Sequence, residues 1–458
     1  MNGKKTSEST RKRESECQIC LIDPHALHRK MNTVFLMVTG LLILMFLPGL
    51  PTCNAASNKA IVINPVTQVQ GYLDQGQLTL DFHPRWGYLP AVLRIFEIPT
   101  TSQTLVFSKT SSQFRLISPR SPRALYFNDT IYVGWVPGGS FLEISAADPT
   151  NSGIFFTLEQ KKTPTPRLIP DNGQCLQCHE SSRTLGVPGH LTRSVYSRSD
   201  GQPHWGAATV NVDHTTPLAE RLGGWYVTGT VGAMTHRGNS TIDDLKATAS
   251  LDAGLGTGVT NLRGWFDVDA YLTPHSDIVA HLVLAHQTQM HNHIAKAAVE
   301  TRKALEYLQN NILLFGEASD QTRSLVRRLI ERPSEKLLRH MLFLDEASLQ
   351  GMVHGTTSFA AEFQKRGLRD HRGRSLRDLD LTTRIFRYPC SYLIYSDAFK
   401  SLPEEVKHYV YARLFHVLAG YDQTNEFDHL SESDRRAIQE ILTETLPEAQ
   451  WYWTRMGP

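Results

Sequence analysis

The residues Cys175-Leu176-Gln177-Cys178-His179 form a C-x-x-C-H string, which is the spacing that attaches haem c to a polypeptide. Two thiols at this spacing reach the two vinyl groups of one porphyrin and form thioether bonds with it. The adjacent imidazole then lies under the iron and supplies its proximal nitrogen ligand. The string therefore predicts one covalent haem c, with Cys175 and Cys178 as attachment points and His179 as an iron ligand.

A cysteine pair of this kind also occurs in zinc sites and in redox dithiols. A zinc site would usually need a second C-x-x-C pair, but the pair Cys17 and Cys20 lies before an apolar N-terminal run and is followed by Leu21. A thioredoxin-like dithiol belongs in a strand–helix–strand context, whereas the turn-forming residues 170–173 precede this motif. Haem attachment is therefore the preferred interpretation. Cys390 is expected to be a buried structural cysteine.

The ligand on the far side of the iron would decide between electron transfer and reactivity. Strong ligands on both sides favour electron transfer, and an open side admits small molecules. Met234 lies 55 residues after His179, and His236 follows two positions later. Both are candidates for the sixth ligand, although the intervening segment lacks the helices of a small cytochrome c.

The segment 277–310 is the strongest helix candidate, and one of its faces offers another sixth ligand. Apolar residues recur on this face at spacings of four and three, interrupted by two histidines. The residues of this face are Val279, Val283, His286, Met290, His293 and Ala297. We expect this helix to pack near the haem, with His286 or else Met290 approaching the iron. The alternatives are a plain core face with hydrogen-bonded histidines, and a non-haem metal on His286 and His293.

The N-terminal region predicts export. The apolar run 34–47 is 14 residues long, which is short for a membrane span but typical of a secretory signal. Cleavage is expected after Ala55 or Ala56, and the signal peptide would cover 31–55. Residues 1–30 are then a non-native or cytoplasmic extension, with translation starting at Met31. An uncleaved run would instead anchor the protein to the membrane. In both cases the body lies outside the cytoplasm, and the periplasm is the expected compartment.

Composition and charge narrow the class of protein. Hydrophobic residues make up 41% and charged residues 20% of the chain, as in a folded globular protein. The formal net charge is +2, and removing residues 1–55, which hold three more basic than acidic residues, leaves about −1. A nearly neutral body gives no argument for nucleic-acid binding.

The order of elements predicts an α+β fold. Residues 57–165 are expected to be a β-rich domain, a sandwich or small barrel, because their apolar runs are rich in β-branched and aromatic residues. The expected strands are 104–110, 114–119, 125–136, 141–146 and 153–160, with a later strand at 223–230. Residues 170–275 form an irregular haem c-binding segment, and 276–458 an α-helical domain.

The helical domain carries clear start and stop signals. Further amphipathic stretches are 319–332, 334–350 and 355–366. Ser401 is expected to cap a helix with Pro403 in its first turn, ending at Gly420. Ser431 is expected to cap another helix that ends before Pro447.

Three runs of the sequence resemble a family of exported bacterial single-haem proteins known as cytochrome c domain-containing. These runs are SKTSSQFRLISPRSPRALYFNDTIYVGWVPGG (108–139), CLQCHESSRTLGVPGHLTRSVYS (175–197) and GGWYVTGTVGAMTHRGN (223–239), and the likeness continues through HQTQMHN (286–292). The resemblance covers most of the exported chain and implies haem c at Cys175, Cys178 and His179. Members of the family often carry His and Met where this chain has Val231 and Arg237, which weakens the case for iron ligation by that loop.

The preferred function is that of a periplasmic c-type cytochrome that exchanges electrons with a redox partner protein. One alternative is a haem c oxidoreductase, peroxidase-like, with an open distal site. The other is a haem-based sensor of redox state or of a small gas. Carbon monoxide binding to the reduced protein separates a carrier from both alternatives.

Overall fold

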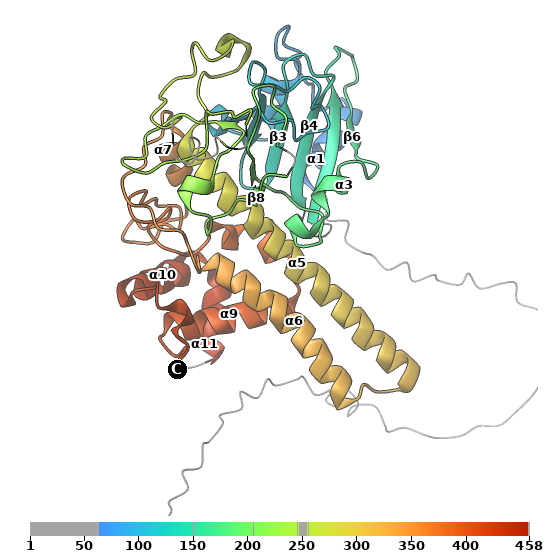
Figure 1. The fold of residues 1–458 in the computed structure, drawn as a ribbon. Helices are drawn as coiled ribbons and strands as arrows, with labels where there is room; N and C mark the ends of the chain where they lie inside the picture. Colours follow the sequence, from blue (N-terminus) through green and yellow to red (C-terminus); the bar gives the residue numbers. More distant parts are fainter. Residues whose placement is uncertain are drawn as a thin grey trace, which may run out of the picture. The chain divides into compact units, whose positions relative to one another are not determined.

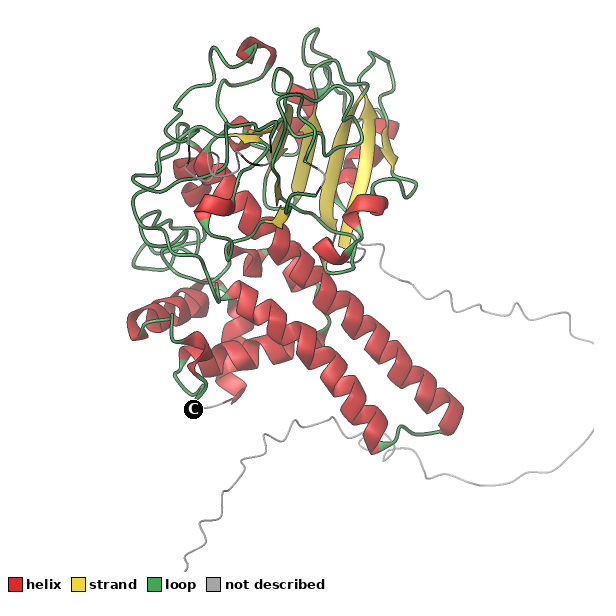
Figure 2. Cartoon of the chain, viewed as in Figure 1, coloured by secondary structure: helices red, strands yellow, loops and turns green. Residues whose placement is uncertain are grey.

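The structure, a computed structural model, combines an antiparallel β-sheet with a set of helices that dominate the C-terminal part (Figures 1 and 2). It describes residues 64–456, apart from positions 149, 151, 205, 245, 247–253 and 255. The predicted α+β class is confirmed at this level. The signal run, its cleavage site and the pair Cys17 and Cys20 lie outside the described residues.

The main sheet has seven strands in the order β6-β5-β4-β3-β2-β1-β9, and every neighbouring pair is antiparallel. The strands are β1 (Thr104–Val106), β2 (Arg123–Phe127), β3 (Ile131–Trp135), β4 (Phe141–Asp148), β5 (Ser152–Glu159), β6 (Leu168–Pro170) and β9 (Trp225–Tyr226). A separate two-stranded sheet pairs β7 (Arg193–Ser194) with β8 (Val210–Asn211).

Several strand predictions need correction. The predicted strands 104–110 and 223–230 shorten to β1 and β9. The run 125–136 is two strands, because the side chain of Asn128 accepts hydrogen bonds from the backbone of Thr130 and Ile131 and closes a tight turn. The run 114–119 forms turns and contains no strand. Its apolar residues Phe114 and Leu116 are exposed, so they do not mark a buried face.

Helices and loops cover the faces of the main sheet, so the predicted sandwich or barrel is wrong. One face packs against α1 (Pro65–Asp74) and α2 (Leu89–Ile95), through residues such as Tyr126 and Val133. The other face, including Phe127 and Tyr132, joins the core formed by the C-terminal helices. Strand β3 is buried along its whole length for this reason.

The long helix α5 (Ile278–Phe315) was predicted from its periodicity and extends five residues beyond the predicted end at 310. Asp277 caps it by accepting the backbone N–H of Val279, and the same carboxylate accepts from the backbone of Thr356 and Thr357. Gly316, with φ of 82°, ends the helix in a conformation that favours glycine.

The other helices are α3 (Leu176–His179), α6 (Asp320–Met341), α7 (Phe359–Lys365), α8 (Asp397–Lys400), α9 (Glu404–Leu418), α10 (Glu432–Thr445) and α11 (Pro447–Met456). Helix α6 runs through Pro333 and joins the predicted stretches 319–332 and 334–350, although it ends at Met341. The predicted Ser401 cap is wrong: Ser401 follows the end of α8, and Pro403 precedes α9 without a side-chain capping hydrogen bond. The Ser431 cap of α10 is confirmed. Within the described residues, no helix has the length and apolarity needed to cross a membrane.

Candidate haem c attachment site

The C-x-x-C-H residues form a single helical turn beside the edge of the main sheet. The backbone N–H groups of Cys178 and His179 donate to the carbonyl of Cys175, at 3.2 and 3.0 Å. Cys178 is exposed and Cys175 half-buried. The His179 ring lies 4.8 Å, between centroids, from Phe155 of the edge-proximal strand β5. Both thiols and the imidazole are thus held in one short turn that is open on one side.

Asp171 organises the chain as it enters this turn. Its carboxylate accepts the backbone N–H of Gly173 at 2.8 Å and that of Cys175 at 3.0 Å. Gly173 has φ of 100°, which a residue with a side chain adopts only with strain. The Pro-Asp-Asn-Gly sequence before the motif therefore forms the loop that delivers Cys175.

His179 is clamped by Gly189 through two hydrogen bonds. Its Nδ1 lies 2.9 Å from the carbonyl oxygen of Gly189, and the backbone N–H of Gly189 donates to the carbonyl of His179 at 2.8 Å. A ring nitrogen facing a carbonyl must carry the proton, so Nε2 keeps its lone pair. Within the described residues Nε2 has no hydrogen-bond partner. Burial lowers the pKa of His179, which keeps the ring neutral near pH 7.

Helix α5 lies directly behind this clamp. The Asn292 side chain accepts the backbone N–H of His190 at 2.9 Å and donates to the carbonyl of His190 at 2.7 Å. A Cβ atom on Gly189 would lie 2.1 Å from the Asn292 Oδ1 atom, so only glycine fits at this contact. Since Gly189 faces Nδ1 of His179, α5 lies on the side of the imidazole away from the free nitrogen.

The thiol of Cys175 does not fit a redox dithiol. Burial and the nearby Asp171 carboxylate raise the pKa of Cys175 to about 12. Reactive dithiols act as thiolates and occur where the pKa is lowered. The turn offers two thiols and an imidazole whose Nδ1 faces a carbonyl, a donor set that fits haem c.

A partly buried ion pair lies next to the motif. Arg123 contacts Glu143, and the Glu143 carboxylate also accepts from the hydroxyls of Ser111 and Ser112 at 2.7 and 2.8 Å. Burial alone would raise the pKa of Glu143, but Arg123 and the two hydroxyls lower it below its usual value. At both Cys175 and His179, the charge of Glu143 raises the pKa and that of Arg123 lowers it.

The first pair of sixth-ligand candidates lies in other surroundings. The Met234 sulfur accepts the backbone N–H of Gln350 at 3.1 Å, and its side chain packs against the main C-terminal core. His236 is buried and its Nδ1 accepts the backbone N–H of Gly238 at 3.0 Å. Within the described residues, no hydrogen bond or ring contact connects either side chain to His179.

The candidates on α5 also lie apart from the motif. Met290 is fully buried in the core. His286 contacts Ser391 and two other histidines, His214 and His340. In the part of the chain that the structure describes, no such contact joins His286 or Met290 to His179. Because α5 lies on the Nδ1 side of His179, this arrangement does not favour His286 or Met290 as the sixth ligand of an iron. Iron ligation by these two residues stays an untested prediction.

Sequence reasoning missed the residues that support the motif. The turn residues of 170–173 were noted only as evidence against a dithiol, yet Asp171 shapes the loop. Gly189 and Asn292 lie within the runs that carry the family resemblance, but nothing in their spacing showed that they meet. His190, the residue after Gly189, is buried, and its Nε2 lies 3.0 Å from the Ser145 hydroxyl.

The comparisons with known proteins add no relationship to this site. No family description matches the chain, and no match was found among curated proteins or among solved structures.

Proposed function

We propose that this chain is an exported protein that carries one haem c, attached through Cys175 and Cys178 with His179 as the proximal ligand. The observation that carries the proposal is the combination of the C-x-x-C-H string with a His179 whose Nδ1 is held by the Gly189 carbonyl and whose Nε2 is free. Iron-ligating histidines commonly donate the other ring N–H to a carbonyl, which fixes the tautomer and the ring orientation.

The residues around the motif would each have a defined task. The Asp171 carboxylate holds the loop that presents Cys175. Gly189 orients the His179 ring, and Asn292 fixes the position of Gly189 from helix α5. When bound, haem supplies an iron centre that cycles between two oxidation states.

Electron transfer to a partner protein is the preferred activity. Cys178 is exposed, so the thioether edge of the porphyrin would lie within reach of a redox partner. The nearly neutral body and the predicted export are compatible with a partner in the periplasm.

A second candidate function follows from the position of α5. The Asn292 contact places α5 on the Nδ1 side of His179, so an iron held by Nε2 would lie away from that contact. An open sixth position is typical of a haem oxidoreductase or a gas sensor. The reduced carrier should not bind carbon monoxide, whereas carbon monoxide binding with a shifted Soret band would support the second candidate.

Covalent attachment is tested by changing the two cysteines. Protein matured in an exporting host should keep peroxidase-stainable haem after denaturing electrophoresis, and Cys175→Ala combined with Cys178→Ala should abolish the stain. Cys390→Ala is the matched control, since Cys390 is buried away from solvent and should not affect the stain. A stained band that survives the double substitution refutes the proposal.

A further inference from the structure

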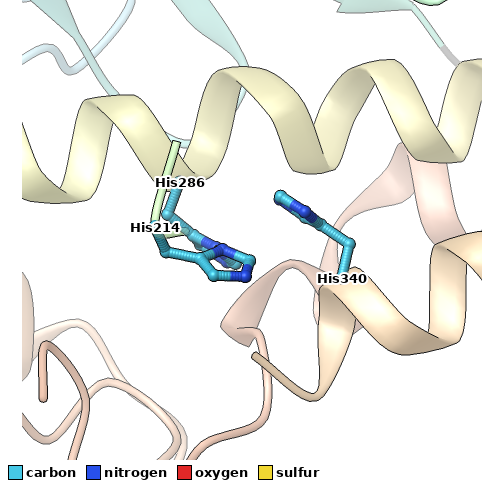
Figure 3. Close-up of side chains that lie close together, drawn as sticks. All are labelled: His214, His286 and His340. Atoms are coloured by element: carbon cyan, nitrogen blue, oxygen red, sulfur yellow. The ribbon is translucent and has the colours of Figure 1, made fainter. Parts of the chain in front are cut away.

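Three buried histidines from separate segments meet between helices α5 and α6 (Figure 3). His286 comes from α5, His340 from α6 and His214 from the loop that follows β8. Their exposed fractions are 0%, 7% and 0%. Each offers one ring nitrogen, and these three atoms lie within 4.8 Å of one another.

Protein groups satisfy only part of the hydrogen-bonding capacity of this cluster. His286 Nε2 lies 2.8 Å from the Ser391 hydroxyl, and His286 Nδ1 lies 3.0 Å from Nδ1 of His214. Within the described residues, the buried Nε2 atoms of His214 and His340 have no hydrogen-bond partner. An unsatisfied buried polar group costs about 1–3 kcal/mol, and here two such nitrogens belong to one cluster of imidazoles that a bound ion would satisfy.

The chemistry of the three side chains suits a metal ion. A neutral imidazole has one lone pair available for coordination and releases no proton when it binds.

The aromatic ring of Phe343 lies on one side of the cluster, and a fourth histidine, His293, lies on another side. The Phe343 ring is 4.2 Å from the ring of His286 and 4.7 Å from that of His214, between centroids. His293 stacks on His340 at 4.6 Å and is partly exposed. The His293 side is therefore where an ion could enter.

One fixed positive charge lies near the cluster, and acidic groups oppose it. Buried Arg221 donates to the carbonyls of Thr216 and His214, at 2.6 and 3.0 Å, and holds the His214 loop in place. Asp213 and Glu346 both interact favourably with its charge. The guanidinium contacts the backbone of His214, so the ring nitrogens remain available.

We propose that His214, His286 and His340 form a binding site for one divalent transition-metal ion of the zinc class, with Ser391 orienting His286. Imidazole nitrogens suit zinc, and three protein ligands leave a fourth position for water. The three ring nitrogens lie within 4.8 Å of one another, so they converge on one point that a single tetrahedral ion can occupy. This site is separate from the haem motif, and the inference does not depend on the proposed function.

The test measures non-haem metal in the exported full-length chain. The protein is treated with a chelator, desalted and dialysed against Zn²⁺, and its metals are then quantified by elemental mass spectrometry. The iron that belongs to haem is determined from the haem absorbance and subtracted from the total iron. We expect about one zinc ion per chain and a higher unfolding temperature when zinc is present. His340→Ala should lose the zinc and the thermal shift, and Ser391→Ala should weaken zinc binding by about 10- to 100-fold.

The control is His408→Ala, an exposed histidine of α9, which should bind zinc as the unmodified chain does. If His340→Ala fails to fold, the proposal is judged on the zinc-dependent shift in the unfolding temperature of the unmodified chain. No zinc uptake and no thermal shift in that chain would overturn the proposal, leaving a hydrogen-bonded core cluster. Equal zinc uptake by a folded His340→Ala variant would also overturn it, because the metal would then bind elsewhere.

Discussion

The contact between Gly189 and Asn292 is the most sensitive point of the candidate haem site. The Gly189 carbonyl fixes the His179 ring, and the Asn292 side chain lies where a Cβ atom of residue 189 would be. Any side chain at this position must displace Asn292, which holds the backbone of His190 through two hydrogen bonds. The orientation of the His179 ring therefore depends on a glycine ten residues away.

Gly189→Ala should reduce both the haem content and the stability of the protein. Forcing a methyl group into this contact is expected to cost about 1–3 kcal/mol in the free energy of unfolding. Urea denaturation and haem absorbance per chain measure the two effects. Gly71→Ala is the control, because an added Cβ there meets nothing within 4 Å and helix α1 tolerates alanine. Equal stability and haem content in both variants would show that Gly189 does not hold the site.

At the scale of elements, α5 connects the two candidate centres. Asn292 on this helix contacts the loop that clamps His179, while His286 faces His214 and His340. The helix was predictable because its apolar periodicity and its Asp277 cap are local signals. The partners of its histidines were not, since His214 and His340 are 72 and 54 positions away from His286 and occur without a spacing motif.

His286→Ala and Met290→Ala test the role of α5 toward the iron. Because α5 lies on the Nδ1 side of His179, we expect both variants to keep the Soret band and the carbon monoxide response of the unmodified chain. His286→Ala should lose the zinc site and Met290→Ala should keep it, although Met290→Ala should lower stability by about 2–5 kcal/mol. A shift of the Soret band toward high spin in His286→Ala would instead support the prediction that His286 ligates the iron.

At the scale of the whole molecule, buried neutral histidines link stability to pH. Burial lowers the pKa of His281 to about 3 and that of His291 to about 4. The unfolded chain, in which histidines titrate near 6.5, binds protons before the folded chain does. Each of these histidines therefore contributes stability that is complete above pH 6.5 and is lost as the pH falls toward 4.

The unfolding free energy should fall between pH 6.5 and pH 4 with a slope of up to about 1.4 kcal/mol per pH unit for each such histidine. Urea titrations at several pH values measure the slope, and His281→Gln with His291→Gln should reduce it. The double variant will be less stable at pH 7, so the slope and not the absolute stability is compared. An unchanged slope would mean that these histidines are protonated in the folded protein.

The sequence predicted individual helices, strands and caps better than the way in which the helices pack on the sheet. The class, the long helix, the Ser431 cap and most strands follow from residue patterns and turn signals. The sandwich was wrong because α1 and α2, which cover one face of the sheet, are short and weakly periodic. The stretches 319–332 and 334–350 meet in one helix across Pro333, because tertiary packing overrides a local signal. The C-x-x-C-H string identifies the candidate site, but its supporting residues come from distant positions.

Intact-mass spectrometry of the exported chain tests the central claim most directly. The mature protein should exceed the mass of its polypeptide by one haem, and a peptide containing Cys175 and Cys178 should carry the whole increment. Its absorption spectrum should show the bands of haem c in both redox states. An exported chain with the mass of the bare polypeptide and both thiols free to react, from a host that matures other c-type cytochromes, would contradict the account.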